Sequence, residues 1–182
     1  MEPILELAEG PARLRIAPTL GGRVVNLRLA GRDGSPRDIL VPFPVDTRPD
    51  ELLHWPKGGI YPLLPYGNRI RDARLRFHGR EYALPPHPAA APHTLHGHAH
   101  RVPWRMTRNT ASSARWELDH RAGESWPWSF LASFSAELSA KTVVFRLALR
   151  NSGEAPMPGG LGLHPYLVHD PTDVLTFRTE ID

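Results

Sequence analysis

Proline and glycine recur along the whole chain and leave no room for long helices. Of the 182 residues, 20 are proline and 15 are glycine, and they are spread through the sequence rather than gathered in one linker. Both residues interrupt regular backbone structure, so the segments between them are short. Several of these segments alternate apolar with polar side chains, as half-buried strands do. The pattern predicts an all-β chain.

The expected strands are joined by short turns. Residues 12–16 and 143–150 alternate most regularly, and His78-Gly79-Arg80 closes a hairpin between residues 73–77 and 81–84. Further strands are expected at residues 4–7, 23–29, 38–41, 104–107, 114–118, 130–138 and 161–167. The proline-rich residues 42–59 and 85–92 are expected to form a long loop and an extended connector. The sequence contains no internal repeat and predicts a single domain over residues 1–182, built as an antiparallel β-sandwich.

Charge and composition exclude several classes of partner. The net charge is only +3, and the basic residues are almost all arginines that stand singly between apolar residues, unlike a nucleic-acid-binding surface. There is no cysteine, which excludes a disulfide framework and thiol chemistry. The first ten residues do not resemble a signal peptide, and no apolar run approaches the roughly 20 residues of a membrane helix. We expect a soluble, cytoplasmic protein that binds neither nucleic acid nor membrane.

Residues 62–100 carry the densest potential site chemistry. Asn68 and Arg69 follow Gly67, so a guanidinium with a fixed fork of donors stands just after a turn, where it can bind vicinal hydroxyls. His96 precedes Gly97, a residue that lets backbone or ligand approach closely. The alternative for Arg69 is a solvated arginine or an ion pair with Asp72.

Three histidines spaced by two residues suggest a second possibility. On a strand, His96, His98 and His100 would face one side and could converge on zinc. A chain with ten histidines also produces such spacing by chance, so His98 and His100 are expected at the surface or behind the site. His164 stands in an apolar segment, where a lone imidazole is more often a core residue than a catalyst. The five tryptophans fit a core, and they also offer flat faces for sugar rings.

Taken together, three motifs resemble the aldose 1-epimerase (galactose mutarotase) family in order and spacing. They are NRIRDARLRFHGREYAL at residues 68–84, HTLHGHAHRVPW at 93–104 and PMPGGLGLHPYL at 156–167. The resemblance runs from about Gly21 to Val168 and implies the large antiparallel β-sandwich of that superfamily, a monosaccharide substrate, and neither a metal nor an organic cofactor. The family's substrate-binding arginine falls on Arg69, next to Asn68, and its two motif histidines fall on His96 and His164.

The resemblance also implies a mechanism. Mutarotation opens the sugar ring by protonating the ring oxygen and deprotonating the anomeric hydroxyl, then recloses it on the other face. His164 is the expected general acid, His96 is expected to assist by hydrogen bonding, and Arg69 and Asn68 are expected to bind hydroxyls. The alternatives are a carbohydrate-binding sandwich without turnover and a histidine-metal enzyme.

Family members are longer, at about 300 residues, and their general-base glutamate lies in the last third. We therefore expect this chain to represent the N-terminal portion of the family fold, truncated at the C-terminus, with open sheet edges that favour self-association. Glu180, Asp173 and Asp182 come too early to match the base.

Overall fold

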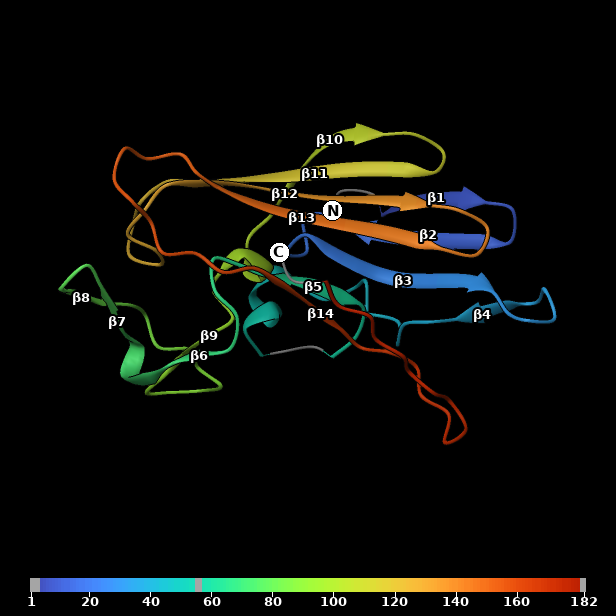
Figure 1. Cartoon of the computed structure of the whole chain (residues 1–182), viewed down its shortest axis with the longest axis horizontal. Helices are drawn as coiled ribbons and strands as arrows, with labels where there is room; N and C mark the ends of the chain where they lie inside the picture. The colour runs from blue at the N-terminus through green and yellow to red at the C-terminus, as the bar shows by residue number, and fades with distance from the viewer. Residues whose placement is uncertain (1–3, 55–56, 181–182) are drawn as a thin grey trace.

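The computed structural model describes residues 4–54 and 57–180, and two antiparallel sheets dominate it (Figure 1). The first sheet has the strand order β1-β2-β3-β5-β14, with β4 also paired to β3. The second has the order β10-β11-β12-β13. The strands of the first sheet are β1 (Leu5–Glu9), β2 (Ala12–Ala17), β3 (Arg23–Ala30), β4 (Pro36–Asp38), β5 (Ile60–Leu63) and β14 (Gly162–Pro165). Those of the second are β10 (Arg105–Asn109), β11 (Ser113–His120), β12 (Phe130–Leu138) and β13 (Val143–Asn151).

Short elements lie at one end of the two sheets, on the left in Figure 1. Two small antiparallel pairs are formed there, β6 (Arg69–Ile70) with β9 (Thr94–Leu95), and the hairpin β7 (Arg74–Phe77) with β8 (Arg80–Ala83). Three short 3-10 helices complete the described elements: Pro49–His54, Arg71–Ala73 and Ala99–Arg101. No helix in residues 4–54 and 57–180 is long and apolar enough to span a bilayer.

The core lies between the two sheets because one face of each is apolar. In β12, every second side chain is buried, from Phe130 to Leu138. Burying a phenylalanine or leucine side chain contributes roughly 1.5–3 kcal/mol to stability. The Trp116 ring packs against Phe134, with ring centroids 4.5 Å apart and the rings tilted by 48°. The Trp116 indole N–H also donates to the carbonyl of Gly22 at 3.0 Å, which fastens the second sheet to the first.

The all-β antiparallel fold is confirmed, and the structure corrects some local expectations. Strand β5 was not expected, because Pro62 in its middle cannot donate to a ladder. The structure accommodates Pro62 because pairing with β3 is limited to the bridge between Val24 and Ile60, which leaves β14 as the neighbour at Pro62. His98 and His100 are buried at 6% and 4% exposure, not at the surface.

An irregularity in β3 determines which side chains leave the core. The register jumps from Arg15 opposite Asn26 to Ile16 opposite Val24, so Val25 is an extra residue. Val24 therefore packs into the core between the sheets, whereas Val25 belongs to a smaller cluster on the opposite face of the first sheet. This opposite face is where the candidate site is found.

Candidate functional site

A row of three side chains crosses adjacent strands on that face. His164 on β14 is the register partner of Tyr61 on β5, and the bridge from Val24 to Ile60 brings Arg23 of β3 beside Tyr61. Neighbouring strands are about 4.8 Å apart, and the groups stack at that spacing. The Tyr61 and His164 rings are 4.9 Å apart and 12° from parallel, and the Arg23 guanidinium carbon lies 4.6 Å from the Tyr61 ring centroid.

His96 joins this row from the loop after β9. Its ring centroid lies 5.5 Å from that of His164 and 6.4 Å from that of Tyr61. The loop can come this close because Gly97 bridges Leu64 directly; a Cβ on Gly97 would stand 1.7 Å from the Leu64 carbonyl oxygen. Gly97 is therefore the residue that seats His96 beside His164.

Asn68 fixes the orientation of the His96 ring. The Asn68 backbone N–H donates to Nδ1 of His96 at 2.9 Å, so that nitrogen is an acceptor and the proton of the neutral ring sits on Nε2. Burial, followed by the charges of His164 and Arg69, lowers the pKa of His96 to about 4. At neutral pH His96 is thus a neutral hydrogen-bond donor through Nε2.

Arg69 and Asn68 are exposed and lie next to His96. Arg69 pairs with Leu95 in the β6–β9 ladder, one residue before His96, and its backbone N–H donates to Oδ1 of Asn68 at 2.9 Å. Its charge acts on the His96 imidazole, which places the two groups within electrostatic reach. Asp72 lies 3.6 Å from His93, and no ion pair to Arg69 is found among the described residues.

Burial lowers the pKa of His164 below that of a free imidazole; the charge of Arg23 lowers it further, and a hydrogen bond to the residue's own backbone opposes both. At neutral pH the ring is therefore neutral and holds one proton. Tyr166 stacks on His164 as well, with ring centroids 5.0 Å apart. The fold places the two motif histidines, His96 and His164, side by side, although they are 68 positions apart in the chain.

The histidines spaced by two residues do not converge on one point: His98 turns away, whereas His96 and His100 both pack near the Tyr61 ring. The strand β9 ends at Leu95 and His96 has a φ of 58°, so the alternation of a strand does not apply. Nε2 of His98 bonds Nδ1 of His120 at 3.0 Å, whereas His100 packs 5.2 Å from Tyr61. Within residues 4–54 and 57–180 no group of three potential metal ligands is present.

Sequence reasoning missed Arg23 and Tyr61. Gly22 precedes Arg23, and Gly59 stands two residues before Tyr61, but nothing in the sequence shows that β3 and β5 are neighbours. A lone arginine before apolar residues recurs along this chain, so Arg23 carried no distinguishing signal in the sequence.

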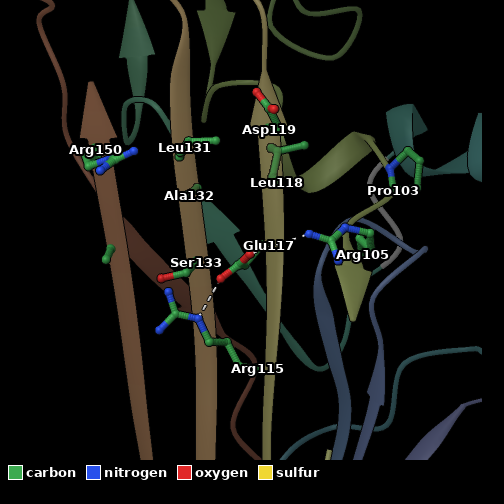
Figure 2. Close-up of a pocket in the computed structure, with 11 residues that line it drawn as sticks. Pro103, Arg105, Arg115, Glu117, Leu118, Asp119, Leu131, Ala132, Ser133 and Arg150 are labelled. Atoms are coloured by element: carbon green, nitrogen blue, oxygen red, sulfur yellow. Dashed lines mark hydrogen bonds and ion pairs between the residues drawn. The ribbon is translucent and has the colours of Figure 1, made fainter. Parts of the chain in front are cut away.

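A separate cavity of about 540 Å³ lies on the outer face of the second sheet (Figure 2). Glu117 is its central acid, 2.8 Å from Arg115 and 3.8 Å from Arg105. None of its lining residues belongs to the histidine group. These charges satisfy one another at the surface and indicate a solvated sheet face.

Comparisons with known proteins agree with the motifs. The sequence profile of the family described as aldose 1-epimerase matches residues 3–177. Two uncharacterized proteins of Escherichia coli K12 are similar: YphB is 32% identical over 111 residues, 61% of this chain and 37% of YphB. YihR is 29% identical over 131 residues, 71% of this chain and 42% of YihR.

Solved structures show the same fold. A candidate aldose 1-epimerase of Escherichia coli K12 has a TM-score of 0.75 and 27% identity, over 93% of this chain and 53% of that one. A galactose mutarotase-like protein from Clostridium acetobutylicum has a TM-score of 0.76 and 22% identity, over 90% and 50%. The chain thus spans about half the length of the solved relatives and less of the curated ones.

Proposed function

Because the chain belongs to the aldose 1-epimerase family, we propose that it binds a hexose or related monosaccharide and interconverts its α and β anomers. The observation that carries the proposal is the pairing of His96 with His164, whose rings lie 5.5 Å apart on one face of the sheet. Arg69, a permanent cation, lies within electrostatic reach of His96.

The proposed reaction moves two protons and breaks one bond. An acid gives a proton to the ring oxygen while the anomeric hydroxyl loses one, the bond between C1 and the ring oxygen breaks, and C1 becomes an aldehyde carbon. Rotation about the C1–C2 bond exposes the other face of the aldehyde, and the reverse steps close the ring. Positioned acid–base groups accelerate such steps by about 10²- to 10⁴-fold.

His164 is the proposed acid and His96 its neighbouring donor. The lowered pKa of His164 makes its protonated form a stronger acid than free imidazole. Nε2–H of His96 is held in one direction by Asn68 and donates to the ring oxygen or a neighbouring hydroxyl. In this scheme Arg69 and the Asn68 amide bind further hydroxyls. Because none of these four residues removes the anomeric proton, solvent water accepts it and returns a proton when the ring closes.

The alternative is a carbohydrate-binding sandwich without turnover, because Arg69 and the histidine pair suffice to hold a sugar. Asp173 does not supply a base at the pair, since its carboxylate is bonded to Arg37 at 3.1 Å at an exposed edge. A cytoplasmic location, a single-domain organisation and self-association through sheet edges also remain proposals from the sequence.

Polarimetry of freshly dissolved α-D-galactose and α-D-glucose tests the proposed activity, and sugar titration followed by NMR tests binding. Faster mutarotation than in buffer supports the enzyme. Binding at His96 and His164 without faster mutarotation supports the non-catalytic alternative, and the absence of both contradicts either function.

A further inference from the structure

Arg23 is a buried cation that the proposed mechanism does not use. The residue is 1% exposed, and its guanidinium carbon lies 4.2 Å from the Phe43 ring centroid and 4.6 Å from that of Tyr61. Burial lowers the pKa of Arg23 to about 10, which leaves it charged at neutral pH. A charge placed between two aromatic faces requires explanation, because taking an ion out of water costs several kcal/mol.

The hydrogen bonds of Arg23 do not explain its burial. Its Nη1 donates to the Gly58 carbonyl at 3.4 Å, a long contact, and its Nε is buried with no partner in the described residues. Among residues 4–54 and 57–180, no carboxylate lies within 4.0 Å of the Arg23 guanidinium. No carboxylate in the described part of the chain therefore neutralises this charge, and the charge acts on its surroundings.

The nearest functional neighbour of Arg23 is His164, one ring away. Tyr61 lies between them in the cross-strand row, so a protonated His164 would face a fixed positive charge across one aromatic ring. The described groups that face His164 are Tyr61 from β5, Tyr166 from the end of β14, His96 from the loop after β9 and, beyond Tyr61, Arg23 from β3. The charge of Arg23 also acts on the buried His100.

We propose that Arg23 is a positioning residue for His164: held against Tyr61, its charge disfavours the imidazolium form of His164 and so makes the protonated ring a stronger proton donor. The inference rests on the proposed anomer interconversion for its catalytic meaning. The effect of the Arg23 charge on His164 is inferred from the geometry of the row and can be tested without turnover.

The test is an NMR titration of the histidine side chains in the 182-residue chain and in three variants. Arg23→Met removes the charge and keeps an apolar stem between Phe43 and Tyr61. Arg23→Gln also removes the charge but keeps a planar polar group there. Arg23→Lys keeps the charge. The exposed His78 on the β7–β8 turn serves as the reference signal in every sample.

We expect the titration midpoint of His164 to move to higher pH in Arg23→Met and Arg23→Gln, and to stay near the wild-type value in Arg23→Lys. Where the wild type turns over, the alkaline limb of the kcat profile, on which the acid loses its proton, moves in the same direction. An unchanged His164 midpoint in either folded neutral variant overturns the proposal. Unfolding of both neutral variants while Arg23→Lys folds also overturns it, because Arg23 would then support the fold instead of His164.

A wild-type chain without mutarotation would contradict the proposed function and leave the titration result unaffected. The two failures are therefore distinguishable: one is read from optical rotation, the other from the His164 midpoint.

Discussion

Asn68 and His96 hold each other through two 2.9 Å hydrogen bonds that run in opposite directions. The Asn68 N–H donates to Nδ1 of the His96 ring, and the His96 N–H donates to the Asn68 carbonyl. Both residues have positive φ, 61° and 58°, a conformation that asparagine tolerates better than most side chains. The pair gives the imidazole one orientation and one tautomer before any ligand arrives.

The first prediction concerns that tautomer. We expect His96 to carry its proton on Nε2 throughout the neutral range, because protonating Nδ1 would break the bond from Asn68. Long-range ¹H–¹⁵N spectra of the histidine rings distinguish the two forms directly. A ring protonated on Nδ1 would contradict the assigned role of His96 as a donor through Nε2.

The second prediction concerns the close approach at Gly97. Gly97→Ala should lower the free energy of unfolding by more than about 3 kcal/mol, since its Cβ would overlap the Leu64 carbonyl and its φ is 66°. Gly79→Ala is the matched control, with a φ of 75° and nothing within 4 Å. Its backbone strain alone should cost about 1–2 kcal/mol. If urea unfolding shows that Gly97→Ala and Gly79→Ala lower the free energy of unfolding equally, the contact at Leu64 does not matter.

Much of the fold was predictable from local sequence. Strand β12 was expected at residues 130–138 and is found there, because its alternation reports one buried and one exposed face. Strand β5 was not predicted, because a proline stands in its middle and its place depends on the neighbours β3 and β14. The alternation of apolar and polar residues along a strand shows which side chains are buried. It does not show which strands are neighbours, because that depends on how the whole chain folds.

The site was predictable only as far as its motifs reach. Residues 68–84, 93–104 and 156–167 carry Arg69, His96 and His164, and the structure sets the two histidines side by side. The row from Arg23 through Tyr61 to His164 depends on the extra residue in β3 and on a single bridge to β5. Neither of these has a signature in the sequence.

The third prediction is a loss of stability in mild acid. Burial lowers the pKa of His98 to about 3 and that of His96 to about 4, both from an ordinary value of 6.5. Between pH 6.5 and about 4 the unfolded chain binds protons that the folded chain does not, so stability falls as pH falls through this window. The buried His98 contributes about 1.4 kcal/mol per pH unit, and the partly exposed His96 contributes less because solvent screens its charge.

Urea unfolding at pH 7.5, 6 and 5 measures this slope. His98→Gln should make it shallower, because one of the buried imidazoles no longer titrates. The matched control is His78→Gln at an exposed turn, which should leave the slope as it is. A wild-type free energy of unfolding that stays constant from pH 7.5 to 5 would contradict the prediction.

The fourth prediction follows from the edge of the second sheet. In the described residues β13 pairs only with β12, and Val144 is 44% exposed. Open edges of this kind pair with other chains, and a lysine on the edge opposes such pairing. Val144→Lys should therefore reduce the apparent mass in light scattering, whereas Val174→Lys, at a residue 89% exposed outside the sheets, should not. A monomeric wild-type chain would refute the expected association.

The last prediction separates proton donation from sugar binding at His164. Asparagine keeps a polar side chain on β14 but cannot donate a proton as an acid, so His164→Asn removes an interaction that matters mainly in the transition state. We expect kcat for mutarotation to fall by about 10²- to 10⁴-fold while KM changes much less. His169→Asn is the control, because His169 is exposed beyond the end of β14. Polarimetry at several sugar concentrations gives both constants. If kcat survives the change at His164, the proton comes from another group; if KM rises with kcat unchanged, His164 binds the sugar without acting as its acid.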